Sequence, residues 1–323
     1  MSGNVTAWSL LDEFIAERHA LGYIYKTDEG AVRRFLRDFP DPGDGDLEFT
    51  KEYVLAHTQR KMNQKSNTVL RDICAVNAYL DFVRRKGFPA YKIPPKSLPK
   101  EVRNFRAYIF TEDEIERMLA AADKVPYTNQ NPIRQFQLPV MFRILFNCGL
   151  RISELIRLRV CDVDLENKVF TILETKFHKN RLVPFSDVVA DALKEYFRQV
   201  PTLDTWLFPG PKAAGVYSPS GMNNHFRMLL RIAGIPYQGK EKGPRPHAIR
   251  HTFAVHCLNN WVLSGEDLTA SLPVLSRYLG HNGLRGTQKY LQLTAQMYPD
   301  ILQKVESRFG ELIPFMEVPD ETL

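Results

Sequence analysis

The chain has 323 residues, enough for two domains with buried cores, and its 44% hydrophobic and 25% charged residues are typical of a soluble globular protein. Its net charge of +6 and pI near 9.0 permit a polyanionic partner without requiring one. The sequence has no apolar run of about 18 residues, which excludes a membrane-spanning helix, and we expect no signal peptide.

The four cysteines lack the spacing of a metal site or of a redox pair. Apolar residues surround each of them, so we expect reduced core thiols in a cytoplasmic protein. They are Cys74, Cys148, Cys161 and Cys257.

Residues from Thr6 to about Gly87 are predicted to form four helices, of which Ser66–Lys86 has the clearest apolar stripe, with steps of four and three. The basic residues Arg84, Arg85 and Lys86 lie largely off that stripe. They are either a solvated helix end or a contact to a nucleic-acid backbone.

A stretch rich in proline and basic residues follows, from position 89 to position 106. Proline prevents a helix from forming and keeps such a segment extended, which predicts an interdomain linker. Lys92, Lys96 and Lys100 are candidates to lie along phosphates. The expected organisation is therefore a helical domain at 1–88, a linker at 89–106 and a second domain at 107–323.

The second domain is predicted to begin with a capping box at Thr111, which starts a helix ending near Asp123. An apolar helix from Pro139 to Gly149 follows, and Arg151 comes just before the next helix. The helix dipole disfavours a cation at that position, so Arg151 needs another reason to be there. Glu154, three residues on, can orient it, although an ordinary surface ion pair would look the same.

Alternating residues at 168–174 and 181–185 predict a β-hairpin with its tip at 175–180. Lys176 and Lys179 both belong to that tip, where lysines are normally solvated. Further along, a helix at about 220–233 carries Arg227 and Arg231, and the loop after it carries Lys242 and Arg245. We treat these four as candidate DNA contacts.

The stretch from His247 to Tyr290 contains the strongest chemical pattern. His247 and Arg250 share a helix face, and Gly280 permits a turn that brings His281 to the same place. Arginine and histidine donors without a carboxylate partner suit an anion, and Tyr290 is a candidate nucleophile. The neighbouring histidines at 251 and 256 are interpreted as packing residues.

These residues resemble the tyrosine recombinases, or phage-integrase family. The resemblance rests on Gly-Leu-Arg-Ile-Ser-Glu-Leu at 149–155, on a hairpin lysine, and on the His-x-x-Arg, Leu-Gly-His and C-terminal Tyr motifs. The six matching positions are Arg151, Lys176, His247, Arg250, His281 and Tyr290. The resemblance implies a mainly α-helical fold with a small β-hairpin or sheet (α+β), in which a helical core-DNA-binding domain precedes a catalytic domain.

The resemblance also implies roles for these residues. Tyr290 would attack a DNA phosphate to give a 3′-phosphotyrosine, Lys176 would protonate the leaving 5′ oxygen, and His247 would assist proton transfer at the tyrosine. No carboxylate cluster for Mg²⁺ and no Gly-x-x-x-x-Gly-Lys loop is present, so we expect neither a metal nor another cofactor.

The resemblance further implies double-stranded DNA as the partner, with either four copies of this chain or a paralogous recombinase on paired sites. A type IB topoisomerase and a DNA-binding protein without catalysis are the alternatives. Beyond Gly310, an apolar tail follows a predicted helix at about 299–309. It is expected either to pack on its own chain or to insert into a neighbouring protomer.

Overall fold

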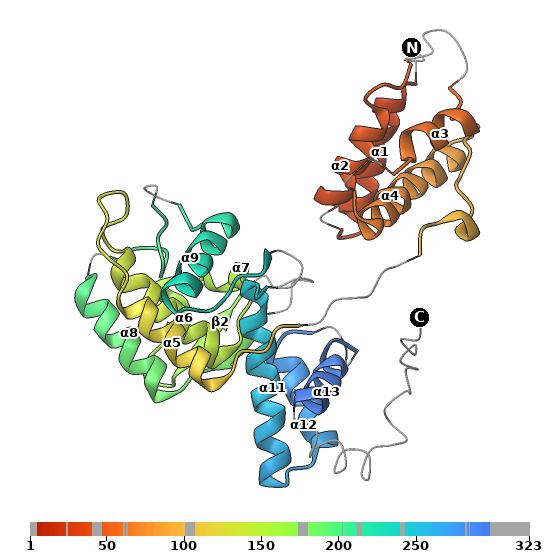
Figure 1. Cartoon of the computed structure of the whole chain (residues 1–323). Helices are drawn as coiled ribbons and strands as arrows, with labels where there is room; N and C mark the ends of the chain where they lie inside the picture. The colour runs from red at the N-terminus through yellow and green to blue at the C-terminus, as the bar shows by residue number, and fades with distance from the viewer. Residues whose placement is uncertain are drawn as a thin grey trace. The chain divides into compact units, whose positions relative to one another are not determined.

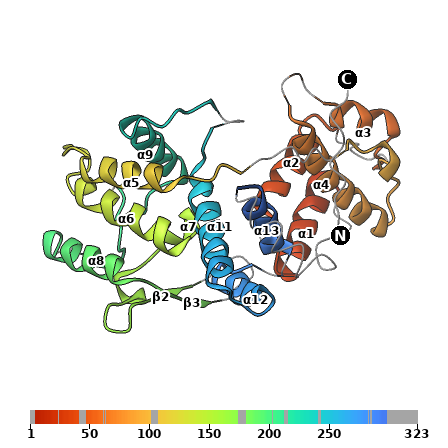
Figure 2. The ribbon, with the colours of Figure 1, turned by 60° about the horizontal axis from the view of Figure 1, so that its bottom comes forward.

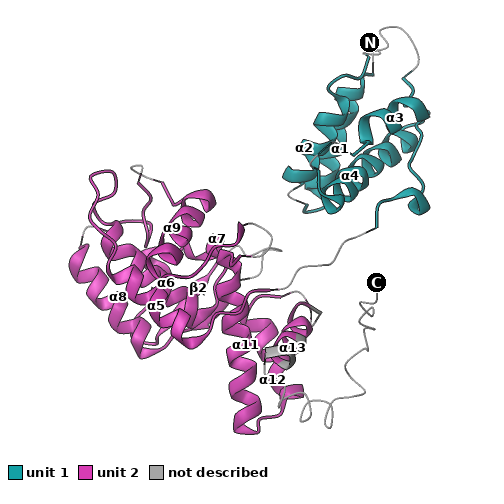
Figure 3. Ribbon diagram, in the orientation of Figure 1, with its two compact units in different colours: residues 1–105 teal, residues 106–323 magenta. Residues whose placement is uncertain are grey.

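The computed structural model describes residues 5–297, except 24, 41–46, 61, 63, 101–106, 174–179, 202, 212–214, 240–242, 282 and 284. The chain divides into two compact units, residues 1–105 and 106–323 (Figure 3). None of the described helices is long and apolar enough to cross a membrane.

The first unit is a four-helix cluster around one aromatic-rich core (Figure 1). Thr6 and Thr50 start two of its helices by accepting hydrogen bonds from backbone N–H groups of the first turn. Buried Tyr79 donates its hydroxyl to the carbonyl of Ala7 at 2.6 Å and so fastens the last helix to the first. The helices are α1 (Ala7–Ala20), α2 (Lys26–Leu36), α3 (Lys51–Thr58) and α4 (Ser66–Arg85).

The described part of the predicted linker packs on this first unit. Buried Asn77 of α4 exchanges hydrogen bonds with the backbone N–H and C=O of Ile93, at 3.1 and 3.0 Å. Leu98, just after the 3₁₀ turn η1 (Pro95–Ser97), also contacts the core. The compact unit therefore extends beyond the predicted boundary at residue 88.

The larger core of the second unit is built from helices on a small antiparallel sheet in the order β1-β2-β3. The expected hairpin is β2–β3, with Phe170 opposite Val183, and the two-residue strand β1 was not predicted. Its elements are α5 (Glu112–Asp123), α6 (Arg134–Cys148), α7 (Ile152–Leu155), η2 (Val160–Asp162), β1 (Val163–Asp164), β2 (Val169–Ile172), β3 (Arg181–Pro184), α8 (Asp187–Gln199) and α9 (Pro219–Ile232).

The starts of α5 and α6 in this larger core can be compared with the starts predicted from the sequence. The capping box at Thr111 is present, with Glu114 as its reciprocal partner. The predicted start of the next helix at Pro139 is wrong, because α6 begins at Arg134 and contains that proline.

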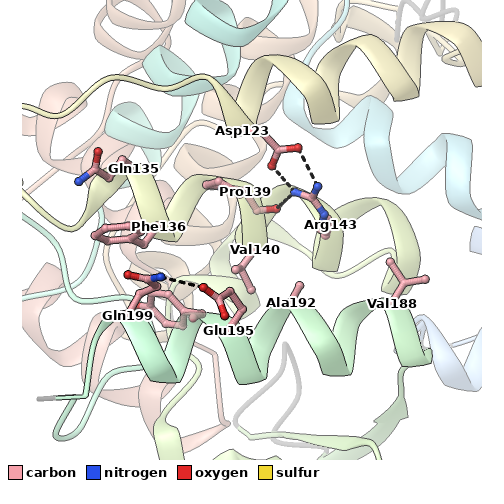
Figure 4. A pocket seen from close by; sticks show the side chains of 11 residues that line it. Asp123, Gln135, Phe136, Pro139, Val140, Arg143, Val188, Ala192, Glu195 and Gln199 are labelled. Atoms are coloured by element: carbon pink, nitrogen blue, oxygen red, sulfur yellow. Dashed lines mark hydrogen bonds and ion pairs between the residues drawn. The ribbon is translucent and has the colours of Figure 1, made fainter.

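On the outer face, side chains of α8 lie across an apolar groove from α6 and from the Asp123–Arg143 ion pair (Figure 4).

A second, smaller core unites the last three described helices, α11 (Pro246–Ser264), α12 (Leu268–Tyr278) and α13 (Arg285–Met297). They lie side by side in Figures 1 and 2. Helix α12 was not predicted from the sequence; Asp267 caps it, and its Leu268 and Leu275 are buried. Tyr290 lies within α13, and the predicted helix at 299–309 falls outside the described residues.

The cysteine prediction is wrong for two of the four residues. Cys148 is buried and Cys257 is partly buried, but Cys74 and Cys161 are exposed. Cys74 directly follows Ile73 of the apolar stripe on α4, and one residue is enough to turn a helical side chain away from the core.

Candidate active site

The site begins where α6 ends. Gly149 terminates the helix in the left-handed conformation at φ 58°, and a Cβ there would lie 2.4 Å from the ring of Phe253. Only glycine fits this position, for both conformational and steric reasons. The chain then turns so that Arg151 becomes the N-cap of α7.

Arg151 is oriented by Glu154. Its Nη1 donates to Glu154 Oε1 at 2.6 Å, and its backbone N–H donates to Oε2 at 2.9 Å. Arg181 of β3 donates to the same two oxygens at 3.0 and 2.8 Å. Burial by itself would raise the pKa of Glu154, but the hydrogen bonds and charges of Arg181 and Arg151 outweigh it and lower the pKa. This carboxylate is buried, so the pair is not an ordinary surface ion pair.

Arg250 enters the site from the first turns of α11 and is only 2% exposed. Its Nη1 donates to the carbonyl of Gly149 at 2.9 Å, and its Nη2 donates to the carbonyl of Leu279 and lies 3.3 Å from His281 Nε2. Burial and the charge of Arg151 lower the pKa of Arg250 to about 10, so the guanidinium remains a cation at neutral pH.

His281 is placed by the turn that ends α12. Gly280 adopts φ 66°, and its carbonyl accepts a hydrogen bond from Arg151 Nη2 at 2.8 Å. The other ring nitrogen of His281, Nδ1, lies 2.9 Å from the hydroxyl of Thr287. Burial and the positive charges of Arg250 and Arg151 lower the pKa of His281 to about 4. The predicted meeting of Arg250 and His281 is thus observed.

Tyr290 faces these groups from α13 and is 1% exposed. Its hydroxyl lies 3.1 Å from His251 Nδ1, and its ring stacks against that of His281 with centroids 6.0 Å apart. Burial raises the pKa of Tyr290, whereas Arg250 and Arg151 lower it and thus partly offset burial. The candidate nucleophile therefore lies beside the candidate anion site.

Two histidines of α11 line this region. The ring of His247 meets that of His251 edge-on, with centroids 4.6 Å apart, and His251 in turn contacts the hydroxyl of Tyr290. Desolvation lowers the pKa of His251 to about 3. His247 is an exposed residue, yet desolvation by its neighbours and the charges of Arg250 and Lys289 lower its pKa to about 4.

The sequence analysis treated His251 as a packing residue and did not consider Arg181. The signal for His251 was its spacing, because position 251 lies one helical turn after 247 on the same face. Arg181 carried no such signal, since its partners come from α7 and α12, which are remote in the sequence.

The other predicted residues are not part of the cluster described above, or are not among the described residues. Lys176, Lys179 and Lys242 are not among the described residues. Three basic residues of the first unit are paired with carboxylates of their own unit: Arg85 with Glu17, Lys86 with Glu13 and Lys92 with Asp81. The remaining candidates are exposed: Arg84, Lys96, Lys100, Arg227, Arg231 and Arg245.

The described residues contain no group of three or more His, Cys, Asp or Glu side chains that could hold a metal ion. The cluster offers guanidinium and imidazole groups instead. Its chemistry fits the binding of a phosphate-like anion beside a phenol.

Comparison with known proteins decides the family. The model of the phage integrase family matches residues 109–297, more than half of the chain. This chain belongs to the phage integrase family. The chain is therefore an enzyme of the tyrosine recombinase type.

Individual relatives extend the match over nearly the whole chain. The putative integrase/recombinase y4rB of Sinorhizobium fredii is 29% identical over 93% of this chain and 97% of its own length. The tyrosine recombinase XerD of Caulobacter vibrioides is 29% identical over 86% of this chain and 88% of its own.

Solved structures share the fold. The Tn1549 transposon integrase in complex with circular intermediate DNA has a TM-score of 0.61 at 19% identity, covering 89% of this chain and 95% of that one. A lambda integrase dimer bound to a core site has a TM-score of 0.62 at 15% identity, covering 88% and 77%.

Proposed function

We propose that this recombinase cleaves and rejoins double-stranded DNA at specific sites through a 3′-phosphotyrosine on Tyr290, without a metal ion or ATP. The observation that carries the proposal is the position of the Tyr290 ring, packed between His251 and His281 beside Arg250. Transfer of a DNA phosphodiester to a tyrosine requires positively charged groups near the phenol oxygen.

The exchange balances without a co-reactant. The Tyr290 oxygen forms a bond to phosphorus while the bond from phosphorus to the 5′ oxygen breaks. The phenol proton leaves to a histidine of the site, and Lys176 gives a proton to the 5′ oxygen. Because the new phosphodiester keeps the energy of the old one, a 5′-hydroxyl of another strand can reverse the step.

Arg151 and Arg250 would stabilise the charge that develops on the non-bridging oxygens, with His281 as a further donor. Removing one such donor typically costs about 10²–10³ in rate. In this structure Arg250 and Tyr290 are both almost fully buried. A strand phosphate reaches them only after neighbouring groups move, so we propose that DNA binding opens the site.

Arg151 also retains donors for this purpose. A guanidinium has five N–H groups, and Arg151 uses Nη1 for Glu154 and Nη2 for Gly280. About a quarter of its side chain is exposed. Of the two arginines, Arg151 is therefore the one that a phosphate would meet first.

We propose that both units contact a DNA duplex. Either four copies of this chain, or this chain together with a paralogous recombinase, would occupy paired sites. Solved relatives of the same fold were crystallised on circular intermediate DNA and on a core site. Phosphate contacts by Lys86 and Lys92 would require exchange of their present carboxylate partners, Glu13 and Asp81. Contacts between basic residues and phosphates release counterions from DNA, so the affinity should fall steeply as salt rises.

The test begins with selection of a binding site from a random duplex pool by the parental protein. A nicked duplex built on the selected sequence should trap an SDS-resistant covalent complex. Tyr290→Phe should abolish that complex and leave binding nearly unchanged, because it removes one oxygen. Tyr278→Phe is the matched control, since its hydroxyl faces the carbonyl of Pro184 rather than the arginines.

Two results would contradict the proposal. A complex that persists in Tyr290→Phe moves the nucleophile elsewhere. Relaxation of supercoiled DNA without any recombinant product identifies a topoisomerase instead.

A further inference from the structure

Three consecutive carbonyl groups before His281 are each held by a different arginine. This turn ends α12 and carries the histidine into the site. The hydrogen bonds run from Arg181 Nε to Tyr278 at 2.7 Å, from Arg250 Nη2 to Leu279, and from Arg151 Nη2 to Gly280 at 2.8 Å.

Arg181 differs from the other two arginines in its surroundings. Its side chain is 8% exposed, and all three of its nitrogens are engaged, Nε by Tyr278 and both Nη atoms by Glu154. The guanidinium also lies against Gly280, since a Cβ there would come within 3.0 Å of Nη1. Arg181 therefore touches the groups that hold the site rather than the site itself.

Its contacts join parts of the site that come from different cores. Glu154 belongs to α7, packed with the larger core, and Tyr278 ends α12 in the smaller core. Arg181 joins them through one rigid planar group, and a lysine ammonium lacks the geometry to make the same three bonds.

We propose that Arg181 is a positioning residue for strand cleavage, a role that rests on the proposed function above. By fixing both oxygens of Glu154 it fixes Arg151, and by fixing the turn it fixes His281. Donors stabilise a transition state most when they need no reorganisation, and a misplacement of about 1 Å can cost about 10²-fold in rate.

The experiment compares Arg181→Met and Arg181→Lys with Arg143→Met. Arg143 makes a matched bidentate pair with Asp123, at 2.6 and 2.8 Å, on the outer face of the same unit. Single-turnover formation of the covalent complex is measured on the selected nicked duplex, at saturating protein and below each melting temperature. We expect a loss of roughly 10- to 100-fold for both Arg181 variants, with duplex affinity nearly unchanged, and parental rates for Arg143→Met.

A second readout separates positioning from mere structural support. A methylphosphonate at the scissile position has one fewer negative oxygen and depends less on Arg151. The loss in Arg181→Met should shrink on that substrate, as it should in Arg151→Lys. Combining Arg151→Lys with Arg181→Met should cost less than the product of the two single losses, because part of the Arg181 effect acts through Arg151.

Parental cleavage rates in the Arg181 variants, or losses that multiply in the double variant, would overturn the inference. If the methionine variant does not fold, the lysine variant decides by the same measurements. Failure of the parental protein to form any covalent complex would instead refute the proposed function.

Discussion

Replacing Glu154 by glutamine is the sharpest test of how this site is built. The carboxylate receives four hydrogen bonds, from the backbone and Nη1 of Arg151 and from both Nη atoms of Arg181. Glutamine keeps the volume but removes the charge and turns one acceptor into a donor that faces a guanidinium. Two cations, and Arg250 close by, would then lack their counter-ion.

The expected cost follows from burial. The side chains of Glu154 and Arg181 are 6% and 8% exposed, and breaking a pair this buried by removing one partner costs about 3–5 kcal/mol. For a unit of this size, each kcal/mol shifts the melting temperature by about 2–4 °C. We therefore expect Tm of the second unit to fall by roughly 6–20 °C.

The assays are urea unfolding, which gives the free energy of unfolding, and thermal melting, which gives Tm, both followed by tryptophan fluorescence. Trp8 lies in the first unit, whereas Trp206 and Trp261 lie in the second, so a Trp8→Phe background reports on the second unit alone. Asp123→Asn is the matched control, because Asp123 also forms a bidentate pair but is 46% exposed. We expect that control to cost about 0–1 kcal/mol.

The outcome that would refute this reasoning is a loss for Glu154→Gln no larger than that for Asp123→Asn. It would mean that the guanidiniums are held by their backbone acceptors and that the carboxylate adds little to stability.

Three further predictions use other features of the second unit. The three site histidines have pKa values of about 3 or 4 in the folded protein against about 6.5 when unfolded. The unfolded state therefore binds more protons, and the free energy of unfolding, measured in urea, should fall as the pH drops below about 6.5. This fall should be less steep in His251→Asn, which lacks one of the three groups. Gly149→Ala should lower the free energy of unfolding, followed by thermal melting, by about 2–5 kcal/mol, because the new Cβ is both conformationally strained and overlaps Phe253. Gly265→Ala should lower it by only about 1–2 kcal/mol, because φ is also positive there but no atom lies within 4 Å. A 5′-bridging phosphorothiolate substrate, whose leaving group needs no proton, should restore cleavage to Lys176→Ala; restoration of Lys179→Ala alone would assign the acid to the second lysine.

The sequence predicted those parts of the site that depend on local spacing. His247 and Arg250 share a face of one helix, and Gly280 turns the chain before His281, as expected. The helical first unit and the β2–β3 hairpin follow from periodicity in the same way. Each of these inferences needed only a few consecutive residues.

What the sequence did not predict depends on contacts between distant segments. The bonds from Arg181 to Glu154 and Tyr278 span 27 and 97 positions, so no local pattern reports them. Helix α12 was not predicted, because the burial of its Leu268 and Leu275 depends on packing against α11 and α13. The hydrogen bonds between Asn77 and Ile93 likewise join part of the predicted linker to the first unit, and no local pattern indicates them.

The arginine bonds to the turn before His281 end on main-chain oxygens, and every residue type supplies such an oxygen. Substitution of the Tyr278 or Leu279 side chain therefore leaves the acceptor in place, so long as the turn itself is kept. The vulnerable positions are the donors and the single glycine at 280, where a side chain would press on Arg181. The site thus presents a small mutational target, because a change of side chain at position 278 or 279 does not remove a hydrogen-bond acceptor.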